Sequence, residues 1–519
     1  MAISRLAAQL RVLRSVSSCG LALLFALVSC VNADQSTQAT APVATSSEGP
    51  LIGVRVGDGA AFLGVPFAEP PVGLLRWAPP KPPALRTGPR EATAFANACM
   101  QGDFTVQWYA ELRAVFGADP KKASRPVGEG EDCLYLNIWT PELSPSEPLP
   151  VMVWIHGGGY EGGWSYEPNS IGENLSKLGV VVVSISYRLG PFGYIGPDGA
   201  ANLGLRDQIA ALQWIATNIA SFGGDKENIT LFGESAGASS IGTLIITPAA
   251  HGLFHRAIHQ SGGFEFIETG TEQTASDAFY LIKAELNGQS IQSASASDIM
   301  AVSDRAIADH WFSPVNDGKV LPDSPRKMLK AASGNMVDVL IGTNGDEWRW
   351  DLKSDALGLQ IQEWREQDPQ LIPIVDRLVA QHGNIGALDR LITADQMICP
   401  GRELMKATLE DGRRVFAYNF TRVREQKADP FIGAYHGAEI PYIFNTHDDW
   451  LHTTADDEKL TRSMMLYWTN FAKTGNPNGL GVPHWPQVSS EQIVYQRLDT
   501  IIDTIGDPYS ELCRFIGSL

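Results

Sequence analysis

The chain has 519 residues and a mass of 56.3 kDa, with 44% hydrophobic and 19% charged residues. This composition is typical of a folded globular protein and excludes a disordered chain. The formal net charge of −18, from 40 basic and 58 acidic side chains, argues against a nucleic acid partner, whose phosphates repel acidic surfaces. The length allows several domains, but one large α/β domain can also contain it.

The N-terminal segment has the features of an export signal. Three arginines precede a short apolar run at residues 21–28, and small residues follow up to Ala33. A positive region, an apolar region and a small-residue end together predict a secretory signal over residues 1–33. We therefore expect a secreted or periplasmic protein.

A second way of processing this signal stays open. The residues Leu27-Val-Ser-Cys30 resemble the site at which bacterial lipoproteins are cut before a cysteine that is then lipidated. The protein would then be anchored to a bacterial membrane through Cys30, although one acyl chain alone anchors only marginally. Residues 34–50 are rich in Ser, Thr, Ala and Pro without a periodic pattern, which predicts a flexible tether. The folded part is expected as one domain over residues 51–519.

Cysteine usage allows two disulfides. Six cysteines are present, and Cys19 and Cys30 lie in the leader. The remaining four are Cys99, Cys133, Cys399 and Cys513. An even number in an exported chain permits two bridges with three pairings open, of which pairing of neighbours along the chain is favoured. Buried free thiols are the alternative, and the absence of C-x-x-C spacing speaks against zinc.

Apolar runs at strand length alternate with helical patterns. Strands are predicted at 151–155, 180–187, 229–232, 337–341 and 415–420, and helices at 205–219 and 458–473. The first helix is expected to end at Gly223-Gly224. This alternation predicts an α/β fold with a large, mostly parallel sheet flanked by helices. In such folds ligands bind at the carboxyl ends of the strands.

The sequence Gly233-Glu-Ser-Ala-Gly237 matches the pattern G-x-S-x-G. It directly follows the predicted strand at 229–232 and opens a run of small residues that suits a closely packed helix, as a nucleophile elbow must. Ser235 is therefore the candidate nucleophile, at a helix N-terminus where backbone N–H groups favour negative charge. The alternative is an ordinary turn with a capping serine.

A serine nucleophile needs N–H donors that hold the oxyanion of the tetrahedral intermediate. The residue after the nucleophile, Ala236, is expected to supply one donor. The glycine-rich segment His156-Gly-Gly-Gly159 follows an earlier predicted strand, where the other donors are expected. Glycine is favoured there because a Cβ would keep the backbone away from the substrate. The alternative is a flexible turn.

The base and its orienting acid are expected after the serine, in the order acid and then histidine. The strand at 337–341 leads to Asp346 and Glu347, and the residues alone do not choose between these two acids. Among five later histidines, His436 follows the strand at 415–420 and precedes an apolar segment, so it is the candidate base. The other four are His382, His447, His452 and His484.

A metal site is not expected from the histidine pattern. His251, His255 and His259 recur at four-residue steps, which suggests one face of a helix. No carboxylate stands among them as in H-E-x-x-H, so a packed or solvated face is the expected role. Serine catalysis needs no metal, and no other cofactor is expected.

Three further segments carry a resemblance to a known family. They are Gly64-Val-Pro-Phe-Ala-Glu-Pro-Pro-Val-Gly-Leu-Leu-Arg-Trp77, Glu131-Asp-Cys-Leu-Tyr-Leu-Asn137, and the stretch from Gly223-Gly-Asp225 through Gly237. In these segments the chain resembles the type-B carboxylesterase family, which includes the cholinesterases and has the α/β-hydrolase fold. The resemblance extends from about Leu51 to Phe515.

The resemblance implies a role for each candidate residue. It implies Ser235, Glu347 and His436 as the catalytic triad. It implies Gly158, Gly159 and Ala236 as the oxyanion donors, the disulfides Cys99–Cys133 and Cys399–Cys513, and a structural ion pair between Arg76 and Glu131. The implied function is a secreted serine carboxylesterase that hydrolyses a small-molecule ester through an acyl-enzyme, without a cofactor.

Two other functions stay open. The same triad could act on a specialised bulky ester, as in a lipase or polyester hydrolase, or on a peptide. A non-catalytic binding module is less favoured, because every triad position is filled. The chain also departs from the family: Trp348 stands where the family often has glycine, and Trp108 does not match the choline-binding tryptophan convincingly. Trp311 and Phe312 are candidates for the acyl pocket.

Overall fold

The computed structural model describes residues 41–267, 269–286, 288–331, 335–352, 356–425 and 432–516. The predicted signal over 1–33, with Cys30, and the tether residues 34–40 lie outside these ranges. The described residues belong to one compact unit, Ala41–Leu519. Within the described ranges, no helix combines the length and the apolar character that a membrane crossing requires.

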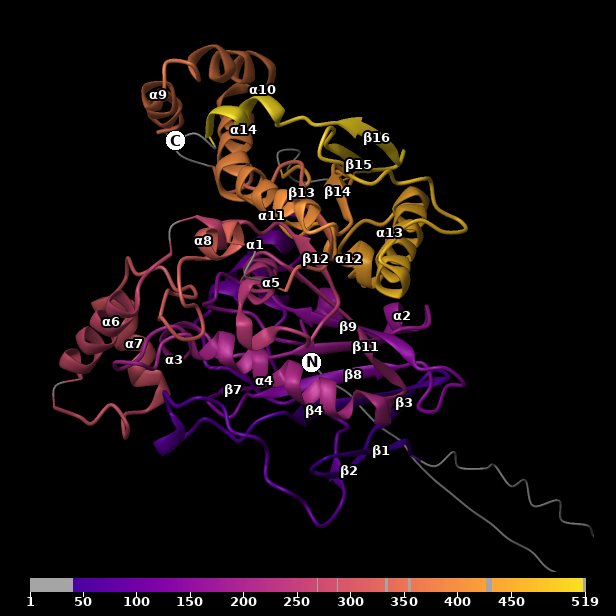
Figure 1. Ribbon diagram of the computed structural model, residues 1–519. Coiled ribbons are helices and arrows are strands. Elements are labelled where there is room, and N and C mark those ends of the chain that lie inside the picture. Colours follow the sequence, from indigo (N-terminus) through magenta and orange to yellow (C-terminus); the bar gives the residue numbers. More distant parts are fainter. Residues whose placement is uncertain are drawn as a thin grey trace, which may run out of the picture. The chain divides into compact units, whose positions relative to one another are not determined.

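An 11-stranded mixed sheet forms the centre of this unit (Figure 1). Its strands lie in the order β16-β15-β14-β13-β12-β11-β9-β10-β8-β4-β3. Neighbours from β15 to β10 are parallel, and antiparallel strands complete both edges. The strands are β3 (Val54–Val56), β4 (Gly59–Pro66), β8 (Tyr135–Thr140), β9 (Leu149–Ile155), β10 (Val181–Ile185), β11 (Gly224–Glu234), β12 (Arg256–Gln260), β13 (Asp338–Asn344), β14 (Val415–Phe420), β15 (Val494–Leu498) and β16 (Asp503–Gly506). The predicted sheet is thereby confirmed.

Smaller elements and helices surround the sheet. The short strands are β1 (Val43–Ser46), β2 (Gly49–Ile52), β5 (Arg90–Glu91), β6 (Ala98–Cys99) and β7 (Glu129–Gly130). The helices are α1 (Phe104–Val115), α2 (Glu173–Ser176), α3 (Gly190–Gly193), α4 (Leu203–Asn218), α5 (Ala236–Ile246), α6 (Glu272–Glu285), α7 (Ala296–Ala306), α8 (Pro325–Lys330), α9 (Leu357–Gln367), α10 (Ile372–Thr393), α11 (Cys399–Glu410), α12 (Ile440–Phe444), α13 (Ala455–Thr474) and α14 (Ser510–Ile516). The predicted helices at 205–219 and 458–473 correspond to α4 and α13.

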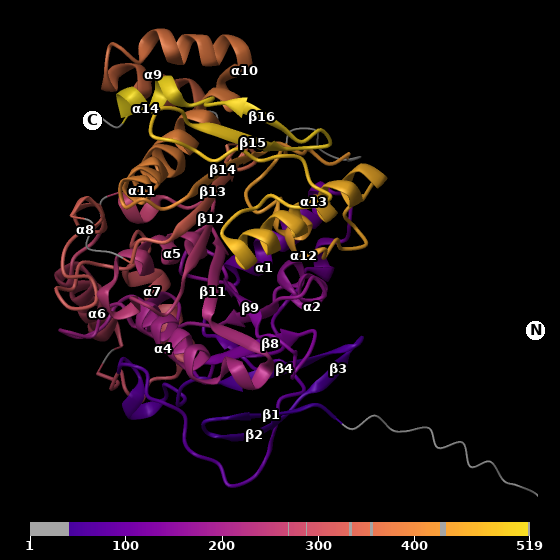
Figure 2. The same cartoon turned by 45° about the vertical axis from the view of Figure 1, so that its right-hand side comes forward.

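The central strands are apolar throughout because both faces of the sheet are covered. In β9, Val151 and Val153 pack into one hydrophobic cluster with α4 and α5, whereas Met152 and Trp154 pack into another with α12 and α13. Successive side chains of a strand point to opposite faces, which explains this division. In Figure 2 the strands accordingly lie between α4 and α5 on one side and α12 and α13 on the other.

The C-terminal helices form a separate small core. Apolar side chains of α9, α10 and α14 pack together with the start of α11. A disulfide between Cys399 and Cys513 joins α11 to α14 within this core. The other disulfide joins Cys99 to Cys133. Both pairs are those implied by the family resemblance.

The predicted start of the folded domain at Leu51 is wrong. Strand β1 begins at Val43 and pairs antiparallel with β2. The polar residues between them are used in contacts: the Ser47 N–H donates to Asn218, and the Trp214 indole N–H donates to Glu48. Composition predicted a tether because it cannot show that these polar groups find partners on α4.

The predicted helix through three histidines is also wrong. His251 follows a short helical turn, His255 lies in the connection before β12, and His259 lies within β12. Strand β12 is a buried inner strand between β11 and β13, so pairing with its neighbours overrides the helical spacing. His259 contacts Glu265 at 2.8 Å, and both side chains are buried.

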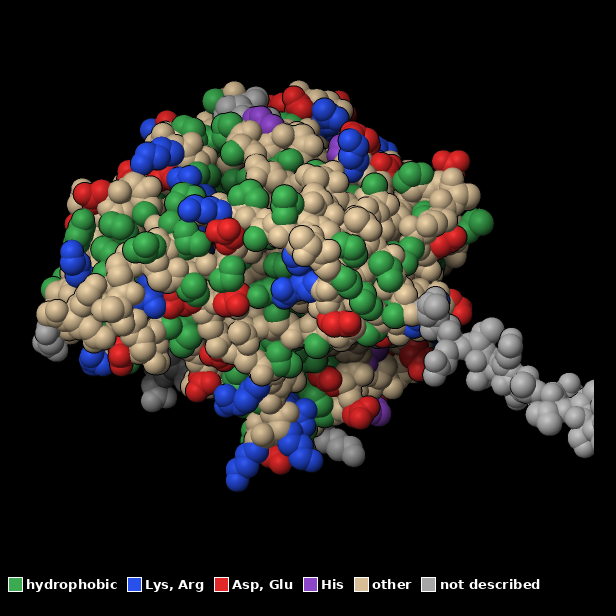
Figure 3. Space-filling model, turned by 90° about the horizontal axis from the view of Figure 1, so that it is seen from below, with side chains coloured by type: hydrophobic (Ala, Val, Ile, Leu, Met, Phe, Trp, Pro, Cys, Tyr) green, Lys and Arg blue, Asp and Glu red, His purple; other side chains and the backbone are tan. Residues whose placement is uncertain are grey.

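Charged side chains lie mostly on the outside, where the cost of removing them from water is avoided. On the face drawn in Figure 3, acidic and basic groups are scattered among hydrophobic and uncharged ones. Among the described residues, some ion pairs are buried, and two of them join an arginine to a carboxylate near the first disulfide and α4. Arg76 pairs with Glu131, as expected, and Arg188 contacts Asp207 through two hydrogen bonds of 2.7 Å from its guanidinium. The Arg188 and Asp207 side chains are 4% and 0% exposed.

We expect Asp207→Asn to lower the free energy of unfolding by about 3 to 5 kcal/mol, because the buried Arg188 charge loses its counter-charge. Urea denaturation followed by tryptophan fluorescence measures this change. Asp103→Asn is the matched control, since Asp103 is paired with Arg125 at 3.2 Å but is 60% exposed. The control should change stability by less than about 1 kcal/mol. Equal denaturation midpoints for the two variants would contradict the expectation.

Candidate active site

Ser235 lies in a tight turn between β11 and α5, as the sequence predicts. Its φ and ψ angles are 57° and −125°, a conformation that a non-glycine residue adopts only where its surroundings enforce it. The Ser235 N–H donates to the Gln260 carbonyl at 2.9 Å, and this bond fixes the turn to the end of β12. The serine therefore stands at the carboxyl edge of the sheet and at the N-terminus of α5.

The glycines on either side of Ser235 are required by a close approach of the backbone. A Cβ on Gly233 would lie 2.6 Å from the Ile155 carbonyl oxygen, and a Cβ on Gly237 would collide with the same oxygen. Ile155 is the last residue of β9. The turn can therefore rest directly on the end of this strand only because both positions lack side chains.

The glycine-rich loop after β9 faces the same turn. Gly158 and Gly159 have φ angles of 96° and 63°, which favour glycine. Within the described residues, the N–H groups of Gly158, Gly159 and Ala236 donate to no protein acceptor. These three donors are therefore free to bind an oxygen atom of a ligand.

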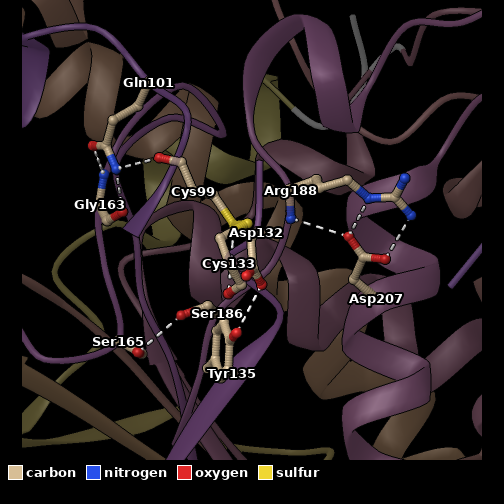
Figure 4. The surroundings of a disulfide bond; sticks show 10 residues. All are labelled: Cys99, Gln101, Asp132, Cys133, Tyr135, Gly163, Ser165, Ser186, Arg188 and Asp207. Carbon is tan, nitrogen blue, oxygen red and sulfur yellow. Dashed lines mark hydrogen bonds and ion pairs between the residues drawn. A yellow bond between two sulfur atoms is a disulfide. The ribbon is translucent and has the colours of Figure 1, made fainter. Parts of the chain in front are cut away.

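The loop is fastened to the first disulfide (Figure 4). The Gln101 side chain donates to the Gly163 carbonyl and accepts from the Gly163 N–H, with both distances 2.9 Å. Gln101 also donates to the carbonyl of Cys99, which is bonded to Cys133. The disulfide thus anchors a segment that holds the far end of the glycine-rich loop.

Glu347 and His436 come together from two loops that follow neighbouring parallel strands, β13 and β14. The His436 Nδ1 atom lies 2.7 Å from Glu347 Oε2. The other oxygen, Glu347 Oε1, accepts from the Ser261 hydroxyl and the Asn344 N–H, both at 2.6 Å. Glu347 is only 1% exposed, so these hydrogen bonds replace the water that its carboxylate has lost.

The neighbouring acid, Asp346, has a different position. Its Oδ2 atom accepts from the Ala434 N–H at 3.0 Å, and its own N–H donates to the Ala434 carbonyl at 3.1 Å. Its other oxygen pairs with Arg349 at 3.0 Å. The choice left open by the sequence is therefore resolved in geometry: Glu347 contacts the histidine, and Asp346 ties together the two loops that carry this pair.

Two further acids surround the histidine, and the sequence analysis did not single them out. Glu234 Oε1 lies 3.2 Å from His436 Nε2. Glu439 is buried and accepts hydrogen bonds from the side chains of Asn344 at 2.7 Å and Gln260 at 3.0 Å. Both acids lie next to the motifs in the sequence: Glu234 is the first of the two variable residues of G-x-S-x-G, and Glu439 follows His436 by three positions.

These acids change the protonation of the site. Burial alone disfavours the charged imidazole, but the carboxylates of Glu234, Glu347 and Glu439 outweigh this effect and raise the pKa of His436. Burial raises the pKa of Glu234. The nearby His436 opposes this rise, and the Glu439 and Glu347 carboxylates add to it. His436 and Glu234 therefore each keep a proton to higher pH than these side chains ordinarily do.

The site opens into a cavity of about 460 Å³. Ser235, Glu347, His436 and the three candidate donors all line it. Several aromatic side chains contribute to its wall: Phe104, Trp108, Tyr160, Phe264, Trp311 and Trp348. Trp108 belongs to α1. Of the two expected acyl-pocket residues, Trp311 lines the cavity, whereas Phe312 packs into the main hydrophobic core.

The chain matches the carboxylesterase family model over residues 40–383 and 379–515. It is 32% identical to the acetylcholinesterase of Bungarus fasciatus, over 95% of this chain and 89% of that protein. It is also 32% identical to the para-nitrobenzyl esterase of Bacillus subtilis (strain 168), over 91% of this chain and 98% of that protein.

Solved structures give the same result for the fold. The carboxylesterase EST55 of Geobacillus stearothermophilus superimposes with a TM-score of 0.79 at 28% identity, covering 91% of this chain and 99% of that chain. A PNB esterase structure superimposes with a TM-score of 0.77 at 30% identity, covering 92% and 99%. The fold is therefore the α/β-hydrolase fold. The chain belongs to the carboxylesterase family and is a carboxylic ester hydrolase.

Proposed function

We propose that the protein is an exported serine carboxylesterase in which Ser235, His436 and Glu347 form the catalytic triad. The observation that carries this proposal is the arrangement of one cavity. A strained serine lies at a helix N-terminus, and the histidine bonded to a buried glutamate lines the same space. These are the parts that nucleophilic catalysis by serine requires.

In the proposed mechanism, Ser235 Oγ attacks the carbonyl carbon of the ester while His436 takes the hydroxyl proton at Nε2. The carbonyl oxygen becomes an oxyanion that the N–H groups of Gly158, Gly159 and Ala236 hold. The intermediate collapses, the C–O bond to the alcohol breaks, and His436 returns the proton to the leaving alcohol. Water then attacks the acyl-enzyme with His436 as base, which releases the acid and restores the serine.

Glu347 has a positioning role in this scheme. Its hydrogen bond to Nδ1 fixes the tautomer in which Nε2, the atom that Glu234 approaches at 3.2 Å, can accept a proton, and its charge stabilises the imidazolium that forms. Its two other hydrogen bonds, from Ser261 and Asn344, prevent it from turning away. The acid is therefore held in place before the substrate arrives.

Export is part of the same proposal. The charged and apolar pattern of residues 1–33 supports it, and so do two disulfides, which persist in oxidising compartments. Cleavage near Ala33 and lipidation of Cys30 are the two alternatives. The mass of the mature N-terminal peptide from a bacterial host distinguishes a free residue near position 34 from an acylated Cys30. An uncleaved N-terminus in the cytoplasm would contradict export.

We expect Ser235→Ala to lower kcat/KM for p-nitrophenyl butyrate by about 10³-fold or more, because the nucleophile is lost. Spectrophotometric release of p-nitrophenol measures this. Ser239→Ala is the matched control, since Ser239 lies one turn further along α5 and lines the same cavity. It should retain most of the activity. A similar loss in both variants would argue against Ser235 as the nucleophile.

The acyl chain of the substrate separates the alternative functions. A preference for p-nitrophenyl acetate and butyrate over the palmitate supports a carboxylesterase of small esters. Faster turnover of the palmitate favours the lipase alternative, and turnover of a polyester film favours the polyester hydrolase.

Glu347→Gln should lower kcat by about 10³- to 10⁴-fold, because the amide no longer stabilises the correct tautomer and the imidazolium. Asp346→Asn is the matched change at the neighbouring position. It should cost far less, because Asp346 contacts the backbone of Ala434 and not the histidine. A larger loss in Asp346→Asn than in Glu347→Gln would overturn the assignment of the acid.

Activity should fall as the pH drops, because protonated His436 cannot act as a base. Glu234→Gln removes a carboxylate that favours the imidazolium, so the pKa of His436 should fall. The acidic limb of the kcat/KM profile should then move to lower pH by about one unit or more. A limb that moves to higher pH would show that Glu234 does not stabilise the protonated base.

A further inference from the structure

We infer that Trp348 is a positioning residue for His436: its indole holds one face of the imidazole ring and stabilises the ring in its protonated form. The inference rests on the proposed function, in which His436 is the base. Trp348 directly follows Glu347 in the chain. One short turn would then supply both the hydrogen bond to the edge of the histidine ring and the contact to its face.

The geometry of the two rings carries the inference. The ring centroids of Trp348 and His436 are 5.4 Å apart, and the ring planes meet at 18°, which is an offset stack. The hydrogen bond from Nδ1 to Glu347 and the contact of Nε2 with Glu234 hold the edges of the imidazole, but neither contact packs against its face. A flat side chain against the face opposes a tilt of the ring. The edge contacts and the face contact therefore restrict different motions of the same ring.

Trp348 is itself held from two directions. Its backbone N–H donates to Asp389 Oδ1 at 2.7 Å, and Asp389 is a residue of α10 that is only 1% exposed. The edge of Phe264 meets the indole at 6.2 Å between centroids, with the planes at 76°. A backbone anchor and an aromatic neighbour thus keep the indole in place. This is the arrangement expected of a side chain that must position another.

The stack also has an electrostatic consequence. When His436 takes the serine proton it becomes a cation, and the face of an indole attracts a cation more strongly than any other side-chain ring. The indole adds this attraction without adding a charge to the site. Losing it should therefore make the imidazolium less stable and the neutral ring relatively more stable.

Other groups also face His436, and they stay in place in a Trp348 variant. Glu347 comes from the turn after β13, where its neighbour Asp346 faces the Ala434 backbone instead, and Glu234 comes from the end of β11. Glu439 comes from the segment of His436 itself, and Asp389 lies on α10 behind the Trp348 backbone. A change that is confined to the Trp348 side chain leaves these five acids intact, so a shift in titration reports on the indole.

The test compares Trp348→Leu, which removes the aromatic face, with Trp348→Phe, which keeps one. Trp311→Leu is the matched control for the loss of an indole from the cavity wall, because Trp311 lines the same cavity and is 66% exposed. For each variant, kcat and KM for p-nitrophenyl butyrate are measured across pH. The His436 pKa is measured independently of turnover by NMR of ¹³C-labelled histidine, with the resonance assigned by His436→Gln.

We expect the fold-loss in kcat of Trp348→Leu to exceed its fold-change in KM by about 10-fold. A residue that only lines the cavity would not produce this difference. The acidic limb and the His436 pKa from NMR should both move to lower pH by about half a unit to one unit. Trp348→Phe should keep most of kcat. Trp311→Leu changes a candidate acyl-pocket residue and can alter KM, but it should leave the His436 pKa from NMR unmoved.

An unchanged His436 pKa in folded Trp348→Leu overturns the inference, and so does a loss that lies in KM alone. The NMR titration decides this point even if the wild-type protein hydrolyses none of the esters. In that case the proposed function fails by itself, while a shifted His436 pKa still supports the contact between the two rings.

Discussion

The contact between the turn at Ser235 and the end of β9 is the constraint on which the site depends. Gly233 and Gly237 both pack against the Ile155 carbonyl, which leaves no room for a side chain at either position. The same contact brings in the loop that continues β9, where a Cβ on Gly157 would lie only 3.1 Å from the Ser235 Cβ. Nucleophile, helix N-terminus and glycine-rich donors are therefore assembled by one close approach of two backbones.

The charge around His436 is the second constraint on the site. The candidate base is surrounded by three carboxylates and one aromatic face, so every neighbour favours its protonated form. Burial opposes that charge, and the balance between these effects sets the pH at which the histidine can act. The hydrogen bonds that Glu347 and Glu439 accept from Ser261, Asn344 and Gln260 keep the acids from moving apart. The same buried hydrogen bonds therefore stabilise the fold and hold the acids beside His436.

Local patterns predicted the sheet, the turn at Ser235 and the loop of His436, because strand periodicity and turn chemistry act over a few residues. They could not choose between Asp346 and Glu347, since adjacent side chains point in different directions and only the partner loop shows which one meets the histidine. They also failed for β1 and for His259, where contacts with α4 and with the neighbouring strands override local preference. The stack of Trp348 on His436 joins residues 88 positions apart, and no spacing rule indicates it.

The most direct test of the central claim is to identify the residue that forms the covalent intermediate. The mature protein is treated with one equivalent of a p-nitrophenyl organophosphate, and the labelled peptide is sequenced by mass spectrometry. The account predicts one phosphoryl group per chain, attached to Ser235, with ester hydrolysis lost in proportion to labelling. Full hydrolysis after complete labelling of Ser235, or stoichiometric inactivation by labelling at another residue, would contradict it.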